Sequence, residues 1–277
     1  MSNKIKTFLK PHIEKVPFLA TSYRKMRDGW QIGREPQPTP NGFKLVGNLS
    51  MQAGNFEPQE TKFFKELAAE ADVVINAGAN IGYYCCHALA MDKHVVAFEP
   101  IALNVKYLLK NLKTNGWEDN VEIFPIAVTD KAGIVTIYGG GTGASLIPGW
   151  AGFSSRQSTM IPASSLDLVL GHRFDGRKVF ILIDIEGVEY QLLQGAKNLL
   201  VADPKPTWMV EIDISQNMPD HEKNPTFLTT FELFWSYGYD SYAIGERLIP
   251  FGRKQVEDLI ANRITLESPN FVFKYKH

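Results

Sequence analysis

The sequence predicts an α/β fold in which a mostly parallel β-sheet carries helices on both faces. Three observations indicate this fold. Apolar stretches at 73–75, 95–98 and 178–184 are continuous, as in strands that are buried on both faces. Helical stretches separate them along the chain, as crossovers between parallel strands require. The stretches 239–244 and 271–275 alternate in polarity instead, so we expect an antiparallel pair at the sheet edge.

The chain is long enough for one large domain, with 277 residues of which 44% are hydrophobic and 21% charged. We divide it into an N-terminal helical extension and linker, residues 1–41, and a main domain, residues 42–277. Residues 1–30 carry seven Lys or Arg against two Asp or Glu, interleaved with apolar side chains. Two placements suit this segment: contact with an anionic membrane surface, or packing on the domain or on a second subunit of a homo-oligomer. The second is favoured because Pro11 and Pro17 break the amphipathic run.

The first half of the main domain predicts alternating strands and helices. Pro, Gly and Asn recur between 34 and 42, which indicates an irregular start before a short strand near 43–46. The spacing of Phe63, Phe64 and Leu67 places them on one helical face. The elements expected next are helix 61–71, strand 73–75, helix 81–91, strand 95–98, helix 103–115 and strand 121–127.

The second half begins with a change of pattern. The stretch 133–138 reads as an additional strand, and the glycines of 139–145 indicate a loop on the substrate side or an ordinary flexible turn. The elements expected after it are an extended piece near 160–162, buried strand 178–184, helix 188–200, buried strand 208–212, helix 227–237 and the antiparallel pair.

A tight turn joins strand 73–75 to the helix after it, with glycines at 78 and 82. Glu99 ends the next strand about 20 residues on, where a ribose would be bound. The turn is one residue shorter than a dinucleotide turn and has no middle glycine, so a pyrophosphate is disfavoured. Asn80 tolerates a left-handed backbone, and its amide can bind a zwitterionic tail. S-adenosylmethionine fits these constraints.

Ligands of such a sheet bind beyond the carboxyl ends of the strands. The segments that follow the strands are rich in carboxylates: 76–82, 99–100, 127–130, 184–187 and 211–213. Asp184 and Glu186 would lie on one side, and mutual repulsion would raise one pKa into the range of a useful base. We therefore expect them to be catalytic. Two structural alternatives are that Asp184 caps the following helix and that Glu186 pairs with a Lys or Arg.

These motifs together resemble the FkbM family of S-adenosylmethionine-dependent methyltransferases over about residues 42–215. The segments that carry the resemblance are Asn76-Ala-Gly-Ala-Asn-Ile-Gly82, Phe98-Glu-Pro100 and Leu182-Ile-Asp-Ile-Glu-Gly187. The resemblance implies a class I Rossmann-like sheet of seven strands with the last strand antiparallel. Together with the strand-end argument it places the cofactor at Glu57, Asn76, Gly78, Ala79, Asn80, Gly82, Glu99, Pro100, Ala127, Val128 and Asp184, and the acceptor at Ser145 and Glu211.

Two residues depart from the family pattern. Asn76 stands where the family usually has Asp, which removes a negative charge near the methionine ammonium, and Glu57 is a candidate to compensate for it. Leu182 stands where the family usually has Lys, so any role of that lysine is absent here. The turn glycines and Glu99 are unaffected.

The resemblance implies O-methylation of a hydroxyl on a sugar, a glycan or a related secondary metabolite. N-methylation of an amide or amine, and a cofactor-binding module without turnover, are the alternatives. A net charge of −1 disfavours nucleic acid as a partner, and no run of 18 apolar residues predicts a membrane span. No metal is expected. Cys85 and Cys86 are neighbours in a helix and point apart, so we expect free buried thiols and a cytoplasmic protein.

Overall fold

The computed structural model describes residues 35–275, so residues 1–34 of the expected extension lie outside the described residues. The end of the linker contains strand β1 (Gln37–Pro38), which pairs antiparallel with β2 (Lys44–Leu45). The short strand expected near 43–46 is therefore present. The short helix α3 (Leu49–Gln52) follows it, and the side chain of Asn48 caps this helix by accepting a hydrogen bond from the Met51 amide.

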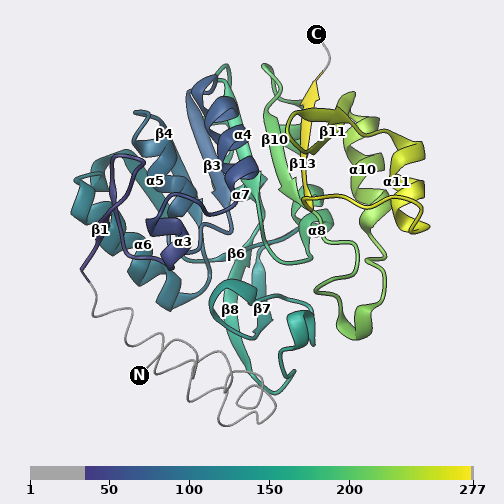
Figure 1. The fold of residues 1–277 in the computed structure, drawn as a ribbon, viewed down its shortest axis with the longest axis horizontal. Coiled ribbons are helices and arrows are strands. Elements are labelled where there is room, and N and C mark those ends of the chain that lie inside the picture. The colour runs from purple at the N-terminus through teal and green to yellow at the C-terminus, as the bar shows by residue number, and fades with distance from the viewer. Residues whose placement is uncertain (1–34, 276–277) are drawn as a thin grey trace.

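An eight-stranded sheet forms the centre of the described chain (Figure 1). The order across it is β12-β11-β13-β10-β9-β3-β4-β5. This is the seven-stranded sheet that the resemblance implies, with β12 added at one edge. The strands in chain order are β3 (Val73–Ala77), β4 (His94–Phe98), β5 (Val121–Phe124), β9 (Val179–Ile183), β10 (Thr207–Glu211), β11 (Tyr239–Ile244), β12 (Leu248–Pro250) and β13 (Asn270–Tyr275).

The register of the central strands decides where the functional residues meet. β3 pairs parallel with β4 and with β9, and Ala77 is level with both Phe98 and Ile183. The residues that follow these three positions therefore leave the sheet at the same edge. The last strand, β13, lies antiparallel between β10 and β11, as expected. The strand–helix crossovers thus bring three separate turns to one edge of the sheet.

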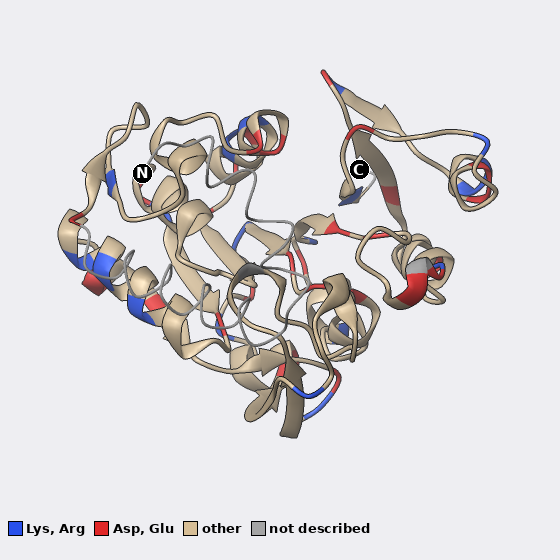
Figure 2. Ribbon diagram, turned by 60° about the horizontal axis from the view of Figure 1, so that its bottom comes forward, with Lys and Arg blue, Asp and Glu red and all other residues tan. Residues whose placement is uncertain are grey.

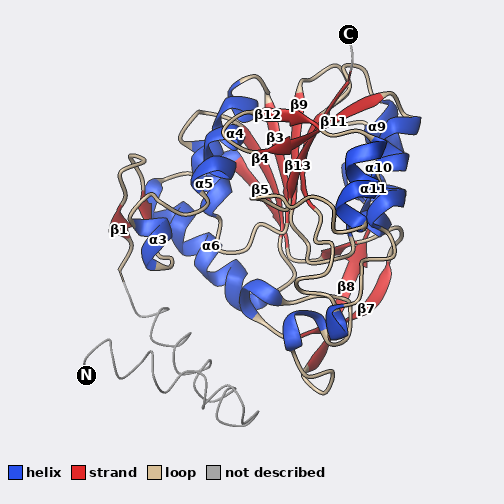
Figure 3. Ribbon diagram, turned by 45° about the vertical axis from the view of Figure 1, so that its right-hand side comes forward, coloured by secondary structure: helices blue, strands red, loops and turns tan. Residues whose placement is uncertain are grey.

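Helices cover both faces of the sheet (Figure 3). Alternate residues of each strand point to opposite faces, so Val74 and Val95 face one apolar core and Val73 and Ile75 face another. The first core contains the apolar sides of α4 (Pro58–Ala69), α5 (Tyr83–Leu89) and α6 (Ala102–Asn115). The second core packs against α7 (Leu166–Leu170), α8 (Glu189–Gln194), α9 (Lys197–Val201), α10 (Phe227–Ser236) and α11 (Arg253–Ile260).

The strand expected over 121–127 is divided between two sheets. Only β5 joins the main sheet, and β6 (Ala127–Val128) pairs instead with β8 (Ser158–Ser164) of a small three-stranded sheet. Pro125 lies between the two segments and has no amide hydrogen to continue the ladder. β7 (Gly133–Tyr138) completes the small sheet by pairing antiparallel with β8.

The single helix expected over 188–200 is two helices, α8 and α9. They are separated at Gly195, where a Cβ atom would lie 2.4 Å from the carbonyl oxygen of Thr129. The chain bends here because it passes against the backbone after β6. The helices α3, α7 and α11 and the strand β12 were not predicted from the sequence.

Candidate active site

The turn after β3 is built from three residues with left-handed backbone. Gly78 has φ +90°, and a Cβ atom there would lie 1.7 Å from the carbonyl oxygen of Asp184. Gly82, with φ +87°, begins α5, and a Cβ atom there would lie 2.3 Å from the side chain of Leu108. Asn80 between them has φ 51°. The glycines are therefore required by close packing of the turn against the end of β9 and the middle of α6.

Glu99 fixes this turn to the end of β4. Its Oε2 accepts a hydrogen bond from the Asn80 amide at 2.7 Å. Its Oε1 accepts hydrogen bonds from the Ile101 amide at 2.8 Å and from Nδ2 of Asn104 at 3.1 Å. The residue is only 4% exposed, and burial raises the pKa of its carboxyl to about 7 against the opposing effect of these donors.

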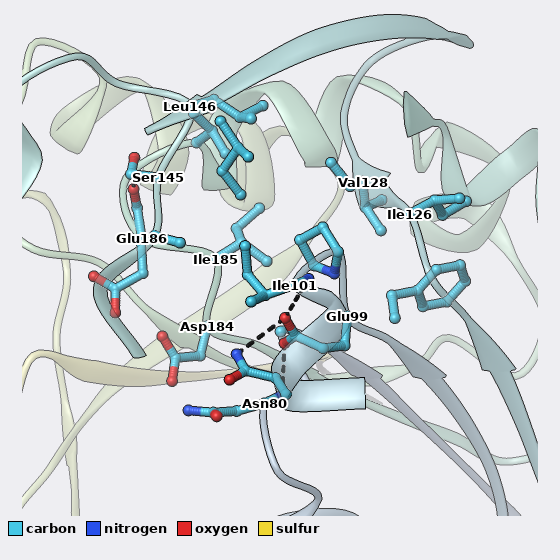
Figure 4. A pocket seen from close by; sticks show the side chains of 18 of the residues that line it. Asn80, Glu99, Ile101, Ile126, Val128, Ser145, Leu146, Asp184, Ile185 and Glu186 are labelled. Carbon is cyan, nitrogen blue, oxygen red and sulfur yellow. Dashed lines mark hydrogen bonds between the residues drawn. The ribbon is translucent and has the colours of Figure 1, made fainter. Parts of the chain in front are cut away.

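A cavity of about 600 Å³, counting the solvent at its mouth, lies beyond the ends of β3, β4 and β9 (Figure 4). Apolar side chains, among them Ile101, Ile126 and Ile185, form part of its wall. Nine of the residues expected from the sequence line it: Gly78, Asn80, Glu99, Pro100, Ala127, Val128, Ser145, Asp184 and Glu186.

Five expected residues lie outside the cavity wall. Asn76 is buried beneath the turn, where its Nδ2 donates to Sγ of Cys85 at 3.4 Å. Ala79 and Gly82 are parts of the turn that face the packed interior. Glu57 precedes α4 with a left-handed φ of 42° and accepts a hydrogen bond from the Tyr84 hydroxyl at 2.8 Å. Glu211 ends β10.

Glu57 and Glu211 are nevertheless close enough to the cavity to be affected by its charges. Burial raises the pKa of Glu57 to about 7, and the charge of Asp184 raises it as well. The charge of Asp184 is the largest cause that raises the pKa of Glu211 far above its usual value, followed by burial and by Glu186. The structure thus brings the carboxylates from three separate strand ends or turns to one place.

Asp184 and Glu186 lie together in the cavity (Figure 4). Burial raises the pKa of Asp184 to about 6. Burial and the charge of Asp184 raise the pKa of Glu186 to about 8. Burial thus raises the pKa of both carboxyls and mutual repulsion adds to the effect at Glu186, which is the direction expected for a buried carboxylate pair.

The two structural alternatives for this pair are not what the structure shows. Val188 is the N-cap of α8 and no side chain caps that helix. Among the described residues, no side chain or backbone group donates a hydrogen bond to the Asp184 carboxylate. Glu186 accepts its hydrogen bond from Nε1 of Trp150 at 2.6 Å and not from a Lys or Arg.

Ser145 and Trp150 come from the connection between β7 and β8. The Ser145 hydroxyl donates its proton to the backbone oxygen of Glu186 at 2.5 Å and accepts a hydrogen bond from the Ile147 amide. For an acceptor molecule this hydroxyl could therefore only accept a hydrogen bond. Trp150 was missed in the sequence analysis because nothing in its local sequence marks it as a contact of residue 186.

Other residues with reactive or family-specific side chains at their positions lie away from the cavity. His172 is 79% exposed, pairs with Asp175 and lies near Val179, which is at the opposite end of β9 from Asp184. Leu182 is buried in the core. Cys85 and Cys86 are free and buried, as expected.

Within residues 35–275, no group of three or more His, Cys, Asp or Glu is arranged to hold a metal ion, and no helix is long and apolar enough to cross a membrane.

Comparison with known proteins gives a family match. The model of the family described as Methyltransferase FkbM domain matches residues 76–241. A search of curated proteins found no match.

Several solved structures resemble the chain at low sequence identity. Methyltransferase FkbM from Methylobacillus flagellatus is 13% identical with a TM-score of 0.48, and the match covers 77% of this chain and 50% of that one. This chain thus spans half the length of that protein. A putative O-methyltransferase from Klebsiella pneumoniae is 11% identical with a TM-score of 0.42, covering 80% and 82% of the two chains. An O-methyltransferase from Bacillus cereus in complex with SAH is 11% identical with a TM-score of 0.40, covering 81% and 83%.

Proposed function

Since the chain belongs to the FkbM methyltransferase family, whose cofactor is S-adenosylmethionine, we propose that it methylates a hydroxyl oxygen of a sugar or glycan. The observation that carries this proposal is the pair Asp184 and Glu186 in the cavity beyond β9. One carboxylate of this pair has its pKa raised to about 8, as a general base that works near neutral pH requires.

The polar groups and charges of the cavity lining suit S-adenosylmethionine. The missing side chain of Gly78 lets the turn pack tightly, and Oδ1 of Asn80 is buried without a hydrogen-bond partner, so it is free to accept one from a ligand. Glu99 lies beside it, where a ribose would be bound. The described residues of the lining include three carboxylates and no Lys, Arg or His. Such a lining suits a cation with a sulfonium and an ammonium group, and it disfavours a pyrophosphate.

When bound, S-adenosylmethionine would supply an electrophilic methyl group: the acceptor oxygen would attack its carbon in line with the carbon–sulfur bond, which breaks with S-adenosylhomocysteine as the leaving group. The protein has to align the acceptor and remove its proton. In our proposal the carboxylate of Glu186 takes the hydroxyl proton as the new oxygen–carbon bond forms. Asp184 lines the same cavity, where its carboxylate would face the positive charge of the bound cofactor.

A second groove, whose lining includes the neighbours of Trp150 in the sequence, has groups that suit a neutral hydroxyl-bearing acceptor. It lies between the segments 148–155 and 216–220, and Gly149 and Ala151 line it on either side of Trp150. Its polar lining consists of amides and hydroxyls, from Ser154, Ser155, Gln216 and Asn217, with Phe153 as an aromatic face. Among residues 35–275, Asp220 is the only charged residue in this lining, and its negative charge disfavours an anionic acceptor. Amides, hydroxyls and an aromatic ring are groups suited to bind a sugar.

The test is transfer of labelled methyl from S-adenosylmethionine to a panel of glycans, peptides and polyketides. We expect label on oxygen of a glycan, and we expect Glu186→Gln to lower the rate about 10²- to 10⁴-fold while S-adenosylhomocysteine still binds. The control is Glu122→Gln, which removes a carboxylate of β5 that pairs with Arg173 and lies outside the cavity lining. Label on a nitrogen atom would show that the protein is an N-methyltransferase and would contradict the proposed O-methylation. Binding without any transfer would identify a non-catalytic module, and full activity of Glu186→Gln would exclude this base.

A further inference from the structure

The connection between β7 and β8 contacts Glu186 at two points. The hydroxyl of Ser145 donates to the backbone oxygen of Glu186, and the indole Nε1 of Trp150 donates to its carboxylate Oε2 at 2.6 Å. Trp150 is only 2% exposed, so the indole is held by packing as well as by this hydrogen bond. A segment 36 to 41 residues earlier in the chain therefore holds both the backbone and the side-chain carboxylate of Glu186.

The backbone around Glu186 is shaped to receive the indole. Glu186 has a left-handed φ of 61°, and Gly187 follows with φ +100°. A Cβ atom on Gly187 would lie 2.4 Å from Cζ3 of Trp150 and 2.8 Å from Cδ1 of Ile147. The indole thus occupies the space that a side chain at 187 would fill. A left-handed conformation at a glutamate is strained and persists only where its surroundings hold it.

The carboxylate of Glu186 needs such a donor because acidic groups surround it. The charges that act on it are those of Asp184, Glu189 and Asp213, and it acts in turn on Glu211. Glu189 and Asp213 are themselves bound to backbone amides, Glu189 to Gly187 and Asp213 to residues 215–217. The Trp150 indole is the only described group that donates to the Glu186 carboxylate.

An indole is suited to this task in a way that a basic side chain is not. Its N–H group stabilises the ionised carboxylate but carries no charge and does not titrate near neutral pH. A Lys or Arg in the same place would hold the carboxylate ionised and lower its strength as a base. The Trp150 bond therefore orients the carboxylate and offsets part of the repulsion, while burial keeps its pKa high.

We propose that Trp150 is a positioning residue that aims the Glu186 carboxylate into the cavity, with Ser145 holding the backbone and Gly187 leaving room for the indole. Its effect on catalysis rests on the proposed function, because it acts through the proposed base. The contact itself does not depend on methyl transfer. The two statements can therefore be tested separately.

The first experiment uses the purified full chain without an acceptor. Tryptophan labelled with ¹⁵N at the indole gives one N–H signal for each of the 5 Trp residues, and the signal missing in Trp150→Phe is that of Trp150. We expect this signal to shift with pH as Glu186 ionises, and we expect the pH dependence to disappear in Glu186→Gln. A Trp150 signal that stays unchanged with pH, or that titrates equally in Glu186→Gln, would overturn the proposal. If Trp150→Phe does not fold, the spectra of the wild type and of Glu186→Gln still test the contact. A single indole signal, that of Trp150, is then expected to lose its pH dependence in Glu186→Gln.

The second experiment measures the pH profile of methyl transfer. A hydrogen bond to a charged group stabilises it enough to change a pKa by about one unit. Trp150→Phe is therefore expected to shift the acid limb of the plot of kcat against pH to higher pH, by about 1 pH unit. The matched control is Trp235→Phe, which removes an indole bond to Ser241 away from the cavity and is expected to leave the profile unchanged. An unchanged acid limb in Trp150→Phe would contradict the positioning role. Absence of transfer by the wild-type chain would contradict the proposed function and leave the indole titration as the test of the contact.

Discussion

Two buried regions of the protein differ in whether burial suits their side chains: one is a layer of aromatic rings and the other is a cluster of carboxylates. The aromatic layer, which consists of Phe227, Phe231 and Phe234 of α10 with Phe271 and Phe273 of β13, is buried and closely packed. The rings of Phe234 and Phe273 stack with their centroids 3.8 Å apart, and Phe231 contacts several rings edge to face or tilted. These side chains carry no polar groups, so burial satisfies them completely.

The carboxylate cluster behaves in the opposite way, because burial disfavours the charged form of its side chains. It consists of Glu57, Asp184, Glu186, Glu189 and Glu211, whose pKa values are all raised by burial or by one another. In Figure 2, Lys and Arg are spread over the outer helices and do not gather in one patch. The comparison teaches that the aromatic layer stabilises the fold, whereas burial and mutual repulsion in the carboxylate cluster oppose folding when its members are ionised.

The largest expected effect is in the aromatic layer. Phe231→Ala removes a ring that packs against Phe227, Phe251, Phe271 and Phe273, and it should lower the free energy of unfolding by about 3–5 kcal/mol. Urea unfolding measures this. Leu109→Ala, on the exposed side of α6, is the control and should change it by less than about 1 kcal/mol. A loss of similar size in both variants would remove the distinction between the aromatic layer and the surface.

A smaller effect is expected at the turn. Glu99→Gln keeps the size of the side chain but removes the charge that faces the Asn80, Ile101 and Asn104 donors. Hydrogen bonds to charged groups contribute about 1.5–3 kcal/mol, so the affinity for S-adenosylhomocysteine should fall about 10- to 100-fold. Calorimetry measures the affinity, with Glu122→Gln again as the control. Unchanged affinity in Glu99→Gln would mean that this carboxylate does not contribute to the cofactor site.

The smallest expected effect is a gain in stability. Glu211→Gln removes one charge from the carboxylate cluster, so the melting temperature at pH 8 should rise on the order of 2–4 °C, which about 1 kcal/mol produces in a domain of this size. At pH 5 the rise should be smaller, because the raised pKa of Glu211 favours the uncharged carboxyl in the folded chain as the pH falls. Thermal unfolding at both pH values measures this. A lower melting temperature at pH 8 would show that Glu211 has a stabilising partner.

The same reasoning predicts how the stability of the wild-type chain depends on pH. The pKa of Glu186 is raised from about 4.5 to about 8 on folding, so the folded chain binds its proton more tightly than the unfolded chain. The resulting stabilisation is complete below about pH 4.5 and is lost as the pH rises through about 8. A cationic cofactor would offset part of this loss by pairing with the ionised cluster.

Much of the fold could be predicted because its signals are local. Continuous apolar strands and amphipathic helices gave β3, β4, β9, β10 and α10 close to their observed bounds. Local patterns failed where a distant contact overrides them. Strand 121–127 was expected to be continuous, but Pro125 and pairing with β8 divide it. Helix 188–200 was expected to be continuous, but the backbone near Thr129 passes against Gly195.

The sequence by itself determined that glycines and carboxylates would meet at the carboxyl ends of parallel strands, because strand, turn and helix signals fix which residues follow each strand. It placed Gly78, Asn80, Glu99, Asp184 and Glu186 at one cavity. Only the tertiary structure decided what holds Glu186, since Trp150 lies 36 residues earlier in a connection of a separate sheet. Contacts between segments so far apart depend on how the sheets pack, and no periodicity within either segment records them.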